Sequence, residues 1–211
     1  MRNLVRAVVF GIAMVGSSAN AITIEWVDWT SGSGGSATGS VAGIGVTYSG
    51  PNMHFIQTGA GTNYWAVDAA YLAGDIDNAP PGNDIIALNA GGISTITFDL
   101  AVVDPVIALV SWNGNVVDFG TAIEVVSVGT GHWGTGSFTN VTATGFSGDG
   151  ELHGVVRILG QHTTISFTHT AELWHGFQVG IEALATEAPE VTPLALLGAG
   201  VVSLGLVRRR S

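Results

Sequence analysis

Short alternating segments separated by turn-forming residues constrain this chain more than any other feature. Apolar and polar residues alternate in 22–28, 44–48 and 93–100, the period-2 pattern of strands with one buried face. Residues 106–112 and 122–128 are continuous apolar runs, which predict strands buried in a sandwich core. Further strands are predicted at 137–140, 142–146, 152–159, 163–168 and 177–181.

Clusters of Gly, Asn, Asp, Ser and Pro lie between these segments and predict the chain reversals, because such residues adopt positive φ or form side-chain turns. The clusters are residues 31–36, 59–63, 80–84, 129–136 and 148–150. Outside the two ends of the chain, only residues 63–72 have a pattern that predicts a short helix. About ten strands without a crossover helix predict an all-β fold, an antiparallel β-sandwich of jelly-roll type, rather than a parallel α/β sheet. A β-solenoid is the weaker alternative.

Composition removes several classes of function. The 211 residues include no cysteine, so zinc ribbons, iron–sulfur clusters and cysteine nucleophiles are excluded. Between residues 22 and 187 there are fifteen acidic residues and a single basic one, Arg157. A surface of that sign repels phosphate backbones, and we therefore predict no nucleic-acid partner.

The N-terminus has the pattern of a secretory signal. Arg2 and Arg6 precede the apolar run 7–15, and small residues follow at 17–21. A basic segment, a short apolar segment and an Ala-x-Ala site are what signal peptidase recognises, which predicts cleavage after Ala21.

The C-terminus has the pattern of a short membrane anchor. Residues 193–207 carry no charge, and Arg208, Arg209 and Arg210 follow directly. As a helix, this run would rise about 22 Å, against a hydrocarbon core of about 30 Å. The arginines would stay on the cytoplasmic side, which leaves the rest of the chain outside.

The same tail carries a family resemblance. Ala188-Pro189-Glu190-Val191, the apolar helix and the terminal arginines closely resemble the PEP-CTERM sorting tail of Gram-negative bacteria, with Val191 where that motif has a second proline. The resemblance implies recognition by exosortase in the inner membrane, cleavage near Pro189 and Glu190, and release or transfer to the cell surface. A generic single-pass anchor is the alternative.

These features divide the chain into a signal peptide (1–21), a β-sandwich ectodomain (22–187) and a sorting tail (188–211) with a single transmembrane helix. The ectodomain resembles, more loosely, those that precede PEP-CTERM tails, through Trp26-x-x-Trp29 and residues 46–50 and 174–180. This looser resemblance implies the fold and the destination only. We predict an exported structural or adhesive protein at the cell surface or in a biofilm matrix with exopolysaccharide.

Enzyme motifs are absent from the sequence. It has no G-x-S-x-G, no H-E-x-x-H and no phosphate-binding glycine loop in a strand-to-helix context. We predict that the protein is not an enzyme. A polysaccharide-acting hydrolase is the alternative, because fifteen acidic residues make some pair about 5 to 9.5 Å apart almost inevitable.

One acidic loop has the composition of a calcium site. The hard cation Ca²⁺ is bound by roughly six to eight oxygen ligands from carboxylates, amides and carbonyls. Turns also favour Asp and Asn, so the composition alone does not distinguish a turn from a metal site. The candidate ligands are Asp75, Asp77, Asn78, Asn83 and Asp84.

His169, Glu172 and His175 are three apart and would share one face of a helix, where they could bind a transition metal. They lie between two predicted strands, which favours a loop anchored by an aromatic residue instead.

Tryptophan is the best candidate for a glycan contact, because an indole ring covers the apolar face of a sugar. Trp133 lies in the glycine-rich run 129–136, which cannot bury a large side chain deeply, so we predict that it is exposed and contacts glycan. This predicts a lectin-like module as the alternative function. Most of the other tryptophans lie in strand patterns and are predicted in the core.

Overall fold

A computed structural model of the protein describes residues 21–72 and 75–182. Ala21, the predicted cleavage position, is exposed at the start of this region. The rest of the predicted signal peptide and the whole predicted sorting tail, including Pro189, Glu190 and the three arginines, lie outside the described residues. Within those residues, no helix combines the length and apolar character that a membrane crossing needs.

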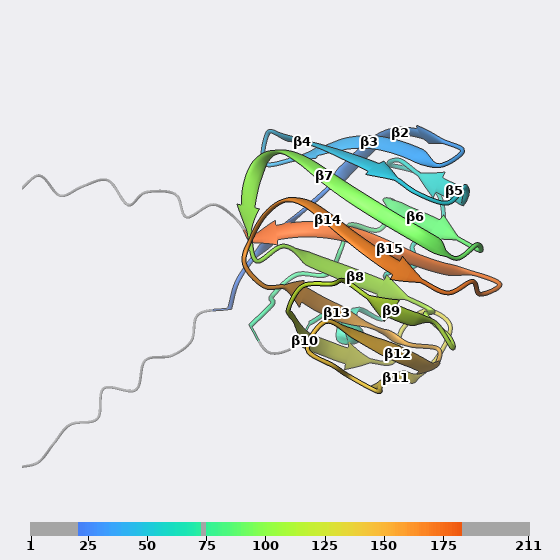
Figure 1. Ribbon diagram of the computed structural model, residues 1–211. Helices are drawn as coiled ribbons and strands as arrows, with labels where there is room; N and C mark the ends of the chain where they lie inside the picture. The colour runs from blue at the N-terminus through green and yellow to red at the C-terminus, as the bar shows by residue number, and fades with distance from the viewer. Residues whose placement is uncertain (1–20, 73–74, 183–211) are drawn as a thin grey trace, which may run out of the picture.

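The chain forms two antiparallel sheets that pack face to face as a β-sandwich (Figure 1). The first sheet contains, in spatial order, β10 (Ile123–Gly129), β13 (His153–Ile158), β8 (Val106–Val110), β15 (His175–Glu182), β6 (Ile85–Leu88) and β5 (Met53–Gln57), with β1 (Ile24–Trp26) also paired to β15. The second contains β11 (Gly136–Thr139), β12 (Gly145–Gly150), β9 (Val116–Asp118), β14 (Gln161–His169), β7 (Gly92–Val103), β4 (Ile44–Ser49), β3 (Ser36–Val41) and β2 (Asp28–Ser33). The predicted all-β antiparallel sandwich is confirmed.

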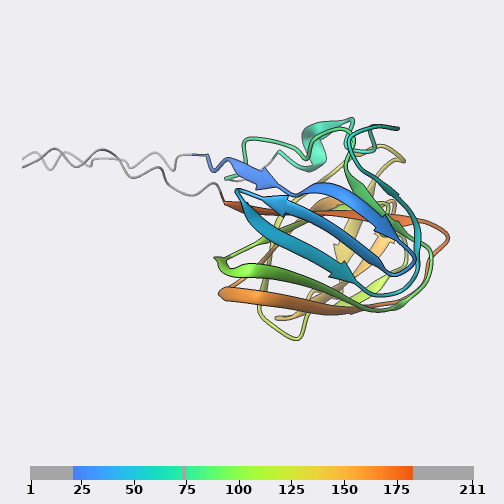
Figure 2. The same cartoon turned by 90° about the horizontal axis from the view of Figure 1, so that it is seen from above.

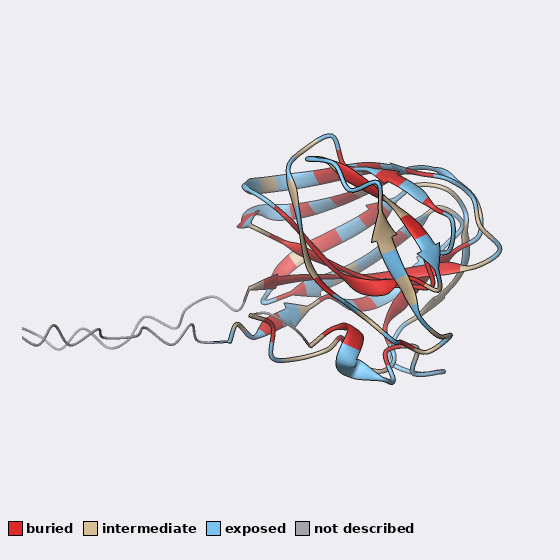
Figure 3. Ribbon diagram, turned by 90° about the horizontal axis from the view of Figure 1, so that it is seen from below, coloured by how far each residue is buried: buried red, intermediate tan, exposed pale blue. Residues whose placement is uncertain are grey.

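Alternation along the strands builds the core between the sheets. In β4, Val46 and Tyr48 are buried while Thr47 is exposed, and β7 repeats the pattern with Ile96, Thr97 and Phe98. Figure 3 shows the resulting bands of buried and exposed positions. Inward-facing side chains of both sheets form one apolar cluster that includes Trp29, Trp112 and Phe177.

A second apolar cluster lies on the outer side of the seven-stranded sheet. In β8, Ile107 and Leu109 face the other sheet, whereas Val106, Ala108 and Val110 face outward against the segment between β5 and β6. We call residues 58–72 and 75–84 together the covering segment; it contains the 3-10 turn η1 (Asp68–Ala70) and supplies Trp65 and Tyr71 to this cluster. Figure 2 shows η1 outside the sheet. The continuous apolar run at β8 is therefore buried on both faces, as predicted.

The other continuous apolar run behaves differently. Residues 122–128 were expected in the core, but β10 is the edge strand of its sheet and most of its residues are only partly buried, with Val128 47% exposed. The prediction of a fully buried strand is wrong there. The reason is that β10 has one neighbouring strand, β13, and no second strand on its other side within the described sheet.

Several reversals and elements also differ from expectation. Residues 148–150 belong to β12 rather than to a turn, and residues 31–36 are mostly the facing ends of β2 and β3, with the reversal at Gly34 and Gly35. The predicted helix at 63–72 is reduced to η1. The predicted strand at 142–146 begins only at Gly145. The sequence patterns missed β3, β5, β6 and β9, and all of β2 beyond Asp28.

Both ends of the described region lie together. β1 pairs with the end of β15 through Ile24 and Glu182, and in Figure 1 the chain enters and leaves on the same side. β15 begins at the opposite end of the sandwich, directly after Trp174.

Candidate functional site

The most prominent surface feature is a group of side-chain rings that we call the aromatic cluster: Phe55, Tyr64, His132, Trp133 and Trp174. Its members come from β5, the covering segment, the loop between β10 and β11, and the loop before β15. The ring centroids of Tyr64 and Trp174 are 5.0 Å apart, those of Tyr64 and His132 5.2 Å, and those of Trp133 and Trp174 6.2 Å. These spacings are typical of interacting aromatic pairs.

Trp133 is the exposed member of the aromatic cluster. Its side chain is 55% exposed, whereas the other four residues are half-buried. The prediction that the glycine-rich loop leaves this indole at the surface is confirmed. The half-buried rings beneath it form a support that fixes its position, since His132 lies 4.8 Å from it in an edge-on arrangement.

Two glycines explain how the loop presents Trp133. The backbone groups of Gly131 and Gly134 hydrogen-bond to each other in both directions, which leaves His132 and Trp133 at the tip of a tight turn. A side chain at Gly131 would collide with the ring of His153, and Gly134 has φ +140°, a conformation that side-chain-bearing residues rarely adopt. The hydroxyls of Thr130 and Thr135, 2.9 Å apart, close the base of this turn.

Polar groups adjoin the aromatic cluster. Asn89, Ala171, Glu172 and Leu173 line a depression of about 430 Å³ directly before Trp174 in space and sequence. One carboxylate oxygen of Glu172 accepts a hydrogen bond from the backbone N–H of Trp174 at 2.7 Å, while Leu173 is 91% exposed. An exposed indole ring beside amide and carboxylate groups can contact both the apolar face and the hydroxyls of a sugar.

Three of the other tryptophans lie in the core, as the sequence predicts for most of them. Trp29, Trp65 and Trp112 are buried. Their indole N–H groups donate to Gln178 Oε1 at 2.7 Å, to the Asp84 carbonyl at 3.0 Å and to the Gly176 carbonyl at 2.7 Å, respectively. These three rings therefore serve the fold and are not available to a ligand.

The candidate calcium ligands all lie in the covering segment, where each has a protein partner. Asp75 pairs with Arg157 at 2.9 Å, Asp77 accepts a hydrogen bond from the Thr23 hydroxyl at 3.0 Å, and Asn78 bonds both backbone groups of Ile24 at 2.7 Å.

The remaining two candidates bind Gly59. Asn83 donates to its carbonyl at 3.3 Å, and Asp84 accepts from its N–H at 2.8 Å. Burial raises the pKa of Asp84 above its ordinary value. Among the described residues, no three His, Asp or Glu side chains form a group that could hold a metal ion. Calcium binding stays a prediction, and a rise in melting temperature with calcium over chelator would support it.

The His169, Glu172 and His175 motif is split by the fold. The two histidines end β14 and begin β15, and both are buried against Trp112, whereas Glu172 lies at the surface depression. His169 Nδ1 lies 3.2 Å from His175 Nε2, and its Nε2 lies 3.0 Å from the Ser94 hydroxyl. Burial lowers the pKa of both rings, with that of His175 at about 3. They are neutral core groups near neutral pH.

Comparison with known proteins adds no assignment: no family model, no curated protein and no solved structure matches the chain. The sequence missed Phe55, Tyr64 and Trp174 as neighbours of Trp133. Only Trp174, in the late Trp-His-Gly-Phe stretch, stood in a segment that the sequence singled out.

Proposed function

We propose that the protein is an exported, non-enzymatic adhesive module that binds neutral polysaccharide through its aromatic cluster. The observation that carries this proposal is the exposed indole of Trp133, held at the tip of a turn on top of four half-buried rings. An exposed indole that continues into further half-buried rings forms a contiguous apolar patch, and such a patch indicates contact with a partner.

The charge of the ectodomain favours a neutral glycan. Among the described residues, Arg157 is the only Lys or Arg side chain, and it is buried in ion pairs. An anionic polysaccharide would meet an acidic surface with no exposed lysine or arginine to attract it. Uncharged sugar rings do not suffer this repulsion.

The predicted signal peptide and sorting tail fit this role. We propose that signal peptidase cleaves after Ala21, that exosortase processes the tail near Pro189 and Glu190, and that the ectodomain then reaches the cell surface or the extracellular matrix. β15 runs from beside Trp174 to Glu182, five residues short of the predicted tail at 188–211. Eight residues of strand are about 27 Å long, so a tail held at the membrane would leave the aromatic cluster at the distal end.

The jelly-roll type is part of the proposal and is supported by strand order. The central strands of the seven-stranded sheet lie in the order β13-β8-β15-β6, and those of the other sheet in the order β12-β9-β14-β7. Successive strands from β6 to β9 and from β12 to β15 thus alternate between the sheets, as two interleaved Greek keys require.

The binding proposal is tested with the full-length protein and an array of neutral glycans, together with insoluble cellulose and chitin. We expect Trp133→Ala to weaken binding about tenfold or more, because it removes the exposed ring. Leu100→Ala is the matched control, since Leu100 is also exposed, at 64%, but lies on β7. Equal binding by wild type and Trp133→Ala, or no binding to any neutral glycan, would overturn the proposal.

The sorting proposal has its own test. Mass spectrometry of protein recovered from the native cells should give a C-terminus near Glu190 and an N-terminus at Ile22. Recovery of chains that still end in Ser211 would contradict processing by exosortase, and would leave the binding test unaffected.

A further inference from the structure

The outer face of the eight-stranded sheet carries two parallel lines of hydroxyl groups, which we call the hydroxyl rows. The strand register aligns one residue from each of five neighbouring strands in each row, from β2 to β14. The first row is Ser31, Thr38, Thr47, Thr97 and Thr164, and the second is Ser33, Ser36, Ser49, Thr95 and Ser166. With about 4.8 Å between strands, each row is roughly 19 Å long.

Every position in the hydroxyl rows is Ser or Thr, although these types make up only 35 of the 211 residues. Nine of the ten are exposed, and Thr95 is half-buried. The inward-facing neighbours Ala37, Tyr48, Ile96 and Ile165 are buried, which fixes the rows on the solvent side. A solvated sheet face normally includes charged side chains, so ten uncharged hydroxyls in register are a distinct surface.

The hydroxyls of the rows differ in their bonding. Ser31 and Thr38 hydrogen-bond to each other at 2.8 Å, and Thr95 and Ser166 at 3.0 Å. Among the described residues, the central hydroxyls of Thr47 and Thr97 and that of Thr164 have no side-chain hydrogen bond. These three adjacent groups are available to a ligand as both donors and acceptors.

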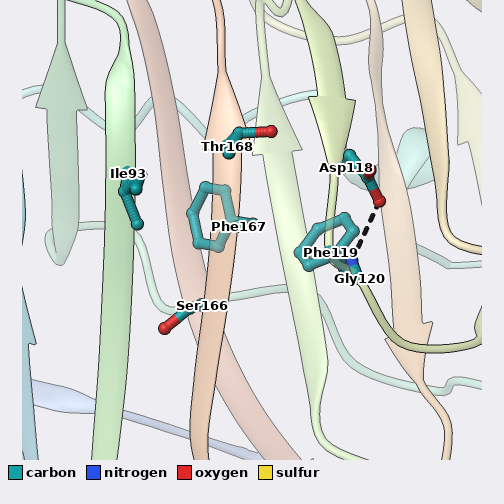
Figure 4. Close-up of a pocket in the computed structure, with 7 residues that line it drawn as sticks. All are labelled: Ile93, Asp118, Phe119, Gly120, Ser166, Phe167 and Thr168. Carbon is teal, nitrogen blue, oxygen red and sulfur yellow. Dashed lines mark hydrogen bonds between the residues drawn. The ribbon is translucent and has the colours of Figure 1, made fainter.

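A depression lies at one end of the second row. It has a volume of about 230 Å³ and is lined by Ile93, Asp118, Phe119, Gly120, Ser166, Phe167 and Thr168 (Figure 4). β14 pairs with β9 only as far as Asp118, and the chain then diverges, which opens the sheet beside Ser166. The rings of Phe119 and Phe167, with centroids 5.1 Å apart, form its apolar floor.

The depression also has a charged acceptor. Asp118 accepts a hydrogen bond from the backbone N–H of Gly120 at 2.9 Å, drawn in Figure 4, and this bond lowers the pKa of the carboxyl. An ionised carboxylate beside an aromatic floor and the hydroxyls of Ser166 and Thr168 matches the mixed polar and apolar surface of a sugar ring. At the other end of the rows, Ser31, Ser33, Ser36 and Thr38 line a second depression of about 300 Å³.

We propose that the hydroxyl rows and the Asp118 depression form a second binding site for neutral polysaccharide, on the face opposite the aromatic cluster. The chain of sugars lies across the strands, from the Asp118 depression over Thr97 and Thr47 toward Ser33. An uncharged strip on an otherwise acidic body admits a neutral ligand and disfavours an anionic one. The inference shares its ligand class with the proposed function but rests on different residues.

Two sites on opposite outer faces give the molecule a further property. The aromatic cluster contacts the covering segment on the outer side of the seven-stranded sheet, and the hydroxyl rows lie on the outer side of the eight-stranded sheet. One molecule can then hold two polysaccharide chains at once and cross-link them, which raises avidity without a second protein.

The test uses the full-length protein with three soluble neutral polysaccharides, dextran, galactomannan and xyloglucan, and with alginate as the anionic comparison. The variant Thr47→Val/Thr97→Val/Thr164→Val removes three hydroxyls at nearly constant shape. The matched control Thr47→Ser/Thr97→Ser/Thr164→Ser keeps the hydroxyls. Binding is measured by affinity electrophoresis and cross-linking by light scattering of the mixtures.

We expect the valine variant to keep binding through the aromatic cluster but to lose cross-linking, and the serine variant to keep both. In a Trp133→Ala background, the valine changes should weaken the remaining binding about tenfold or more. Unchanged cross-linking by the valine variant would overturn this inference and leave the proposed function intact. Loss of all binding with the valine changes alone, and none with Trp133→Ala, would overturn the proposed function instead.

Discussion

The two outer faces of the sandwich differ in what covers them. The seven-stranded sheet presents Val106, Ala108 and Val110 outward, and the covering segment buries them with Trp65 and Tyr71. The eight-stranded sheet presents hydroxyls outward and stays open to solvent. The residue type at the outward positions therefore decides whether a face needs a further layer, because apolar area gains from burial and hydroxyls are satisfied by water.

This difference has a consequence for ligand binding. The covered face can present only what the covering segment and neighbouring loops carry, and the aromatic cluster is assembled there from four separate pieces of chain. The open face presents the sheet itself, with positions fixed by strand register. A site on strands is held more rigidly than a site on loops.

Acid should have the largest effect on stability, because it protonates buried histidines, one of them under the covering segment. His153 lies under the covering segment, where its Nδ1 is 3.3 Å from the Tyr71 hydroxyl, and burial lowers its pKa to about 4. Burial and the neighbouring His169 lower that of His175 to about 3. Both folded-state pKa values lie below the unfolded value of about 6.5.

Folding therefore favours the neutral rings, and this stability is present above about pH 6.5 and is lost as pH falls toward the folded-state values. We expect the melting temperature to fall steeply between about pH 6 and pH 4. Calorimetry across that range checks it. A flat profile would contradict buried neutral histidines. His153→Gln should reduce the slope.

Removing the main anchor of the covering segment should have the next largest effect. Trp65 is 2% exposed and packs edge-on against Tyr71 at 5.2 Å. Trp65→Ala leaves a cavity and removes the indole donor to the Asp84 carbonyl, which keeps only the longer bond from Gln178 at 3.4 Å. We therefore expect a loss of about 3–5 kcal/mol in the free energy of unfolding. Chemical denaturation measures the loss, and hydrogen exchange should localise the opening to the covering segment. Uniform exchange across both sheets would show that the covering segment is not a separate layer.

A comparison of β8 with β10 shows how much of this layer the sequence reveals. Both are largely apolar, although β10 includes Glu124 and Ser127, and both were predicted to be buried. Only β8 lies between two strands and under the covering segment. A local pattern records that a strand is apolar and not which neighbours it has. The identity of the covering layer depends on contacts between residues far apart in sequence, such as Tyr71 and His153.

The candidate sites show the same limit. The exposure of Trp133 follows from its flanking glycines, which act locally. The rings beside it cannot be read from its own segment, because Phe55 and Trp174 are brought there by the sheet. The hydroxyl rows depend on register, and irregularities between Trp29 and Ser31 and between His162 and Thr164 shift that register in a way that alternation does not reveal.

Replacing Arg157 should have an intermediate effect on stability, because its side chain links the covering segment to β10. Its guanidinium, mostly buried, bonds Asp75 of the covering segment at 2.9 Å and Glu124 of β10 at 2.8 Å. Burial of the guanidinium acts to lower its pKa, but the bonds to Glu124 and Asp75 raise it overall. Arg157→Gln leaves these carboxylates facing one another, and we expect it to cost about 2 kcal/mol.

The loss caused by Arg157→Gln should grow at low salt, because the remaining charges then repel more strongly. Denaturant titrations of the wild type and Arg157→Gln at low and high ionic strength measure the loss and its dependence on salt. Glu151→Gln is the matched control, since its carboxylate bonds Ser111 rather than Arg157. A loss that does not depend on salt would mean that Arg157 acts through packing alone.

The open face should give the smallest effect on stability. Thr97 is exposed at the centre of the hydroxyl rows and packs under no further layer. Thr97→Val keeps the β-branched shape that a strand favours, so the free energy of unfolding should change by about 0.5 kcal/mol or less. Denaturation of this variant beside Trp65→Ala measures the contrast directly. A loss of about 2 kcal/mol or more at Thr97 would mean that the hydroxyls hold the sheet together and are not free for a ligand. A near-zero change combined with weaker polysaccharide binding would instead assign these hydroxyls to recognition, because a group that contributes nothing to folding but changes binding acts on the ligand itself.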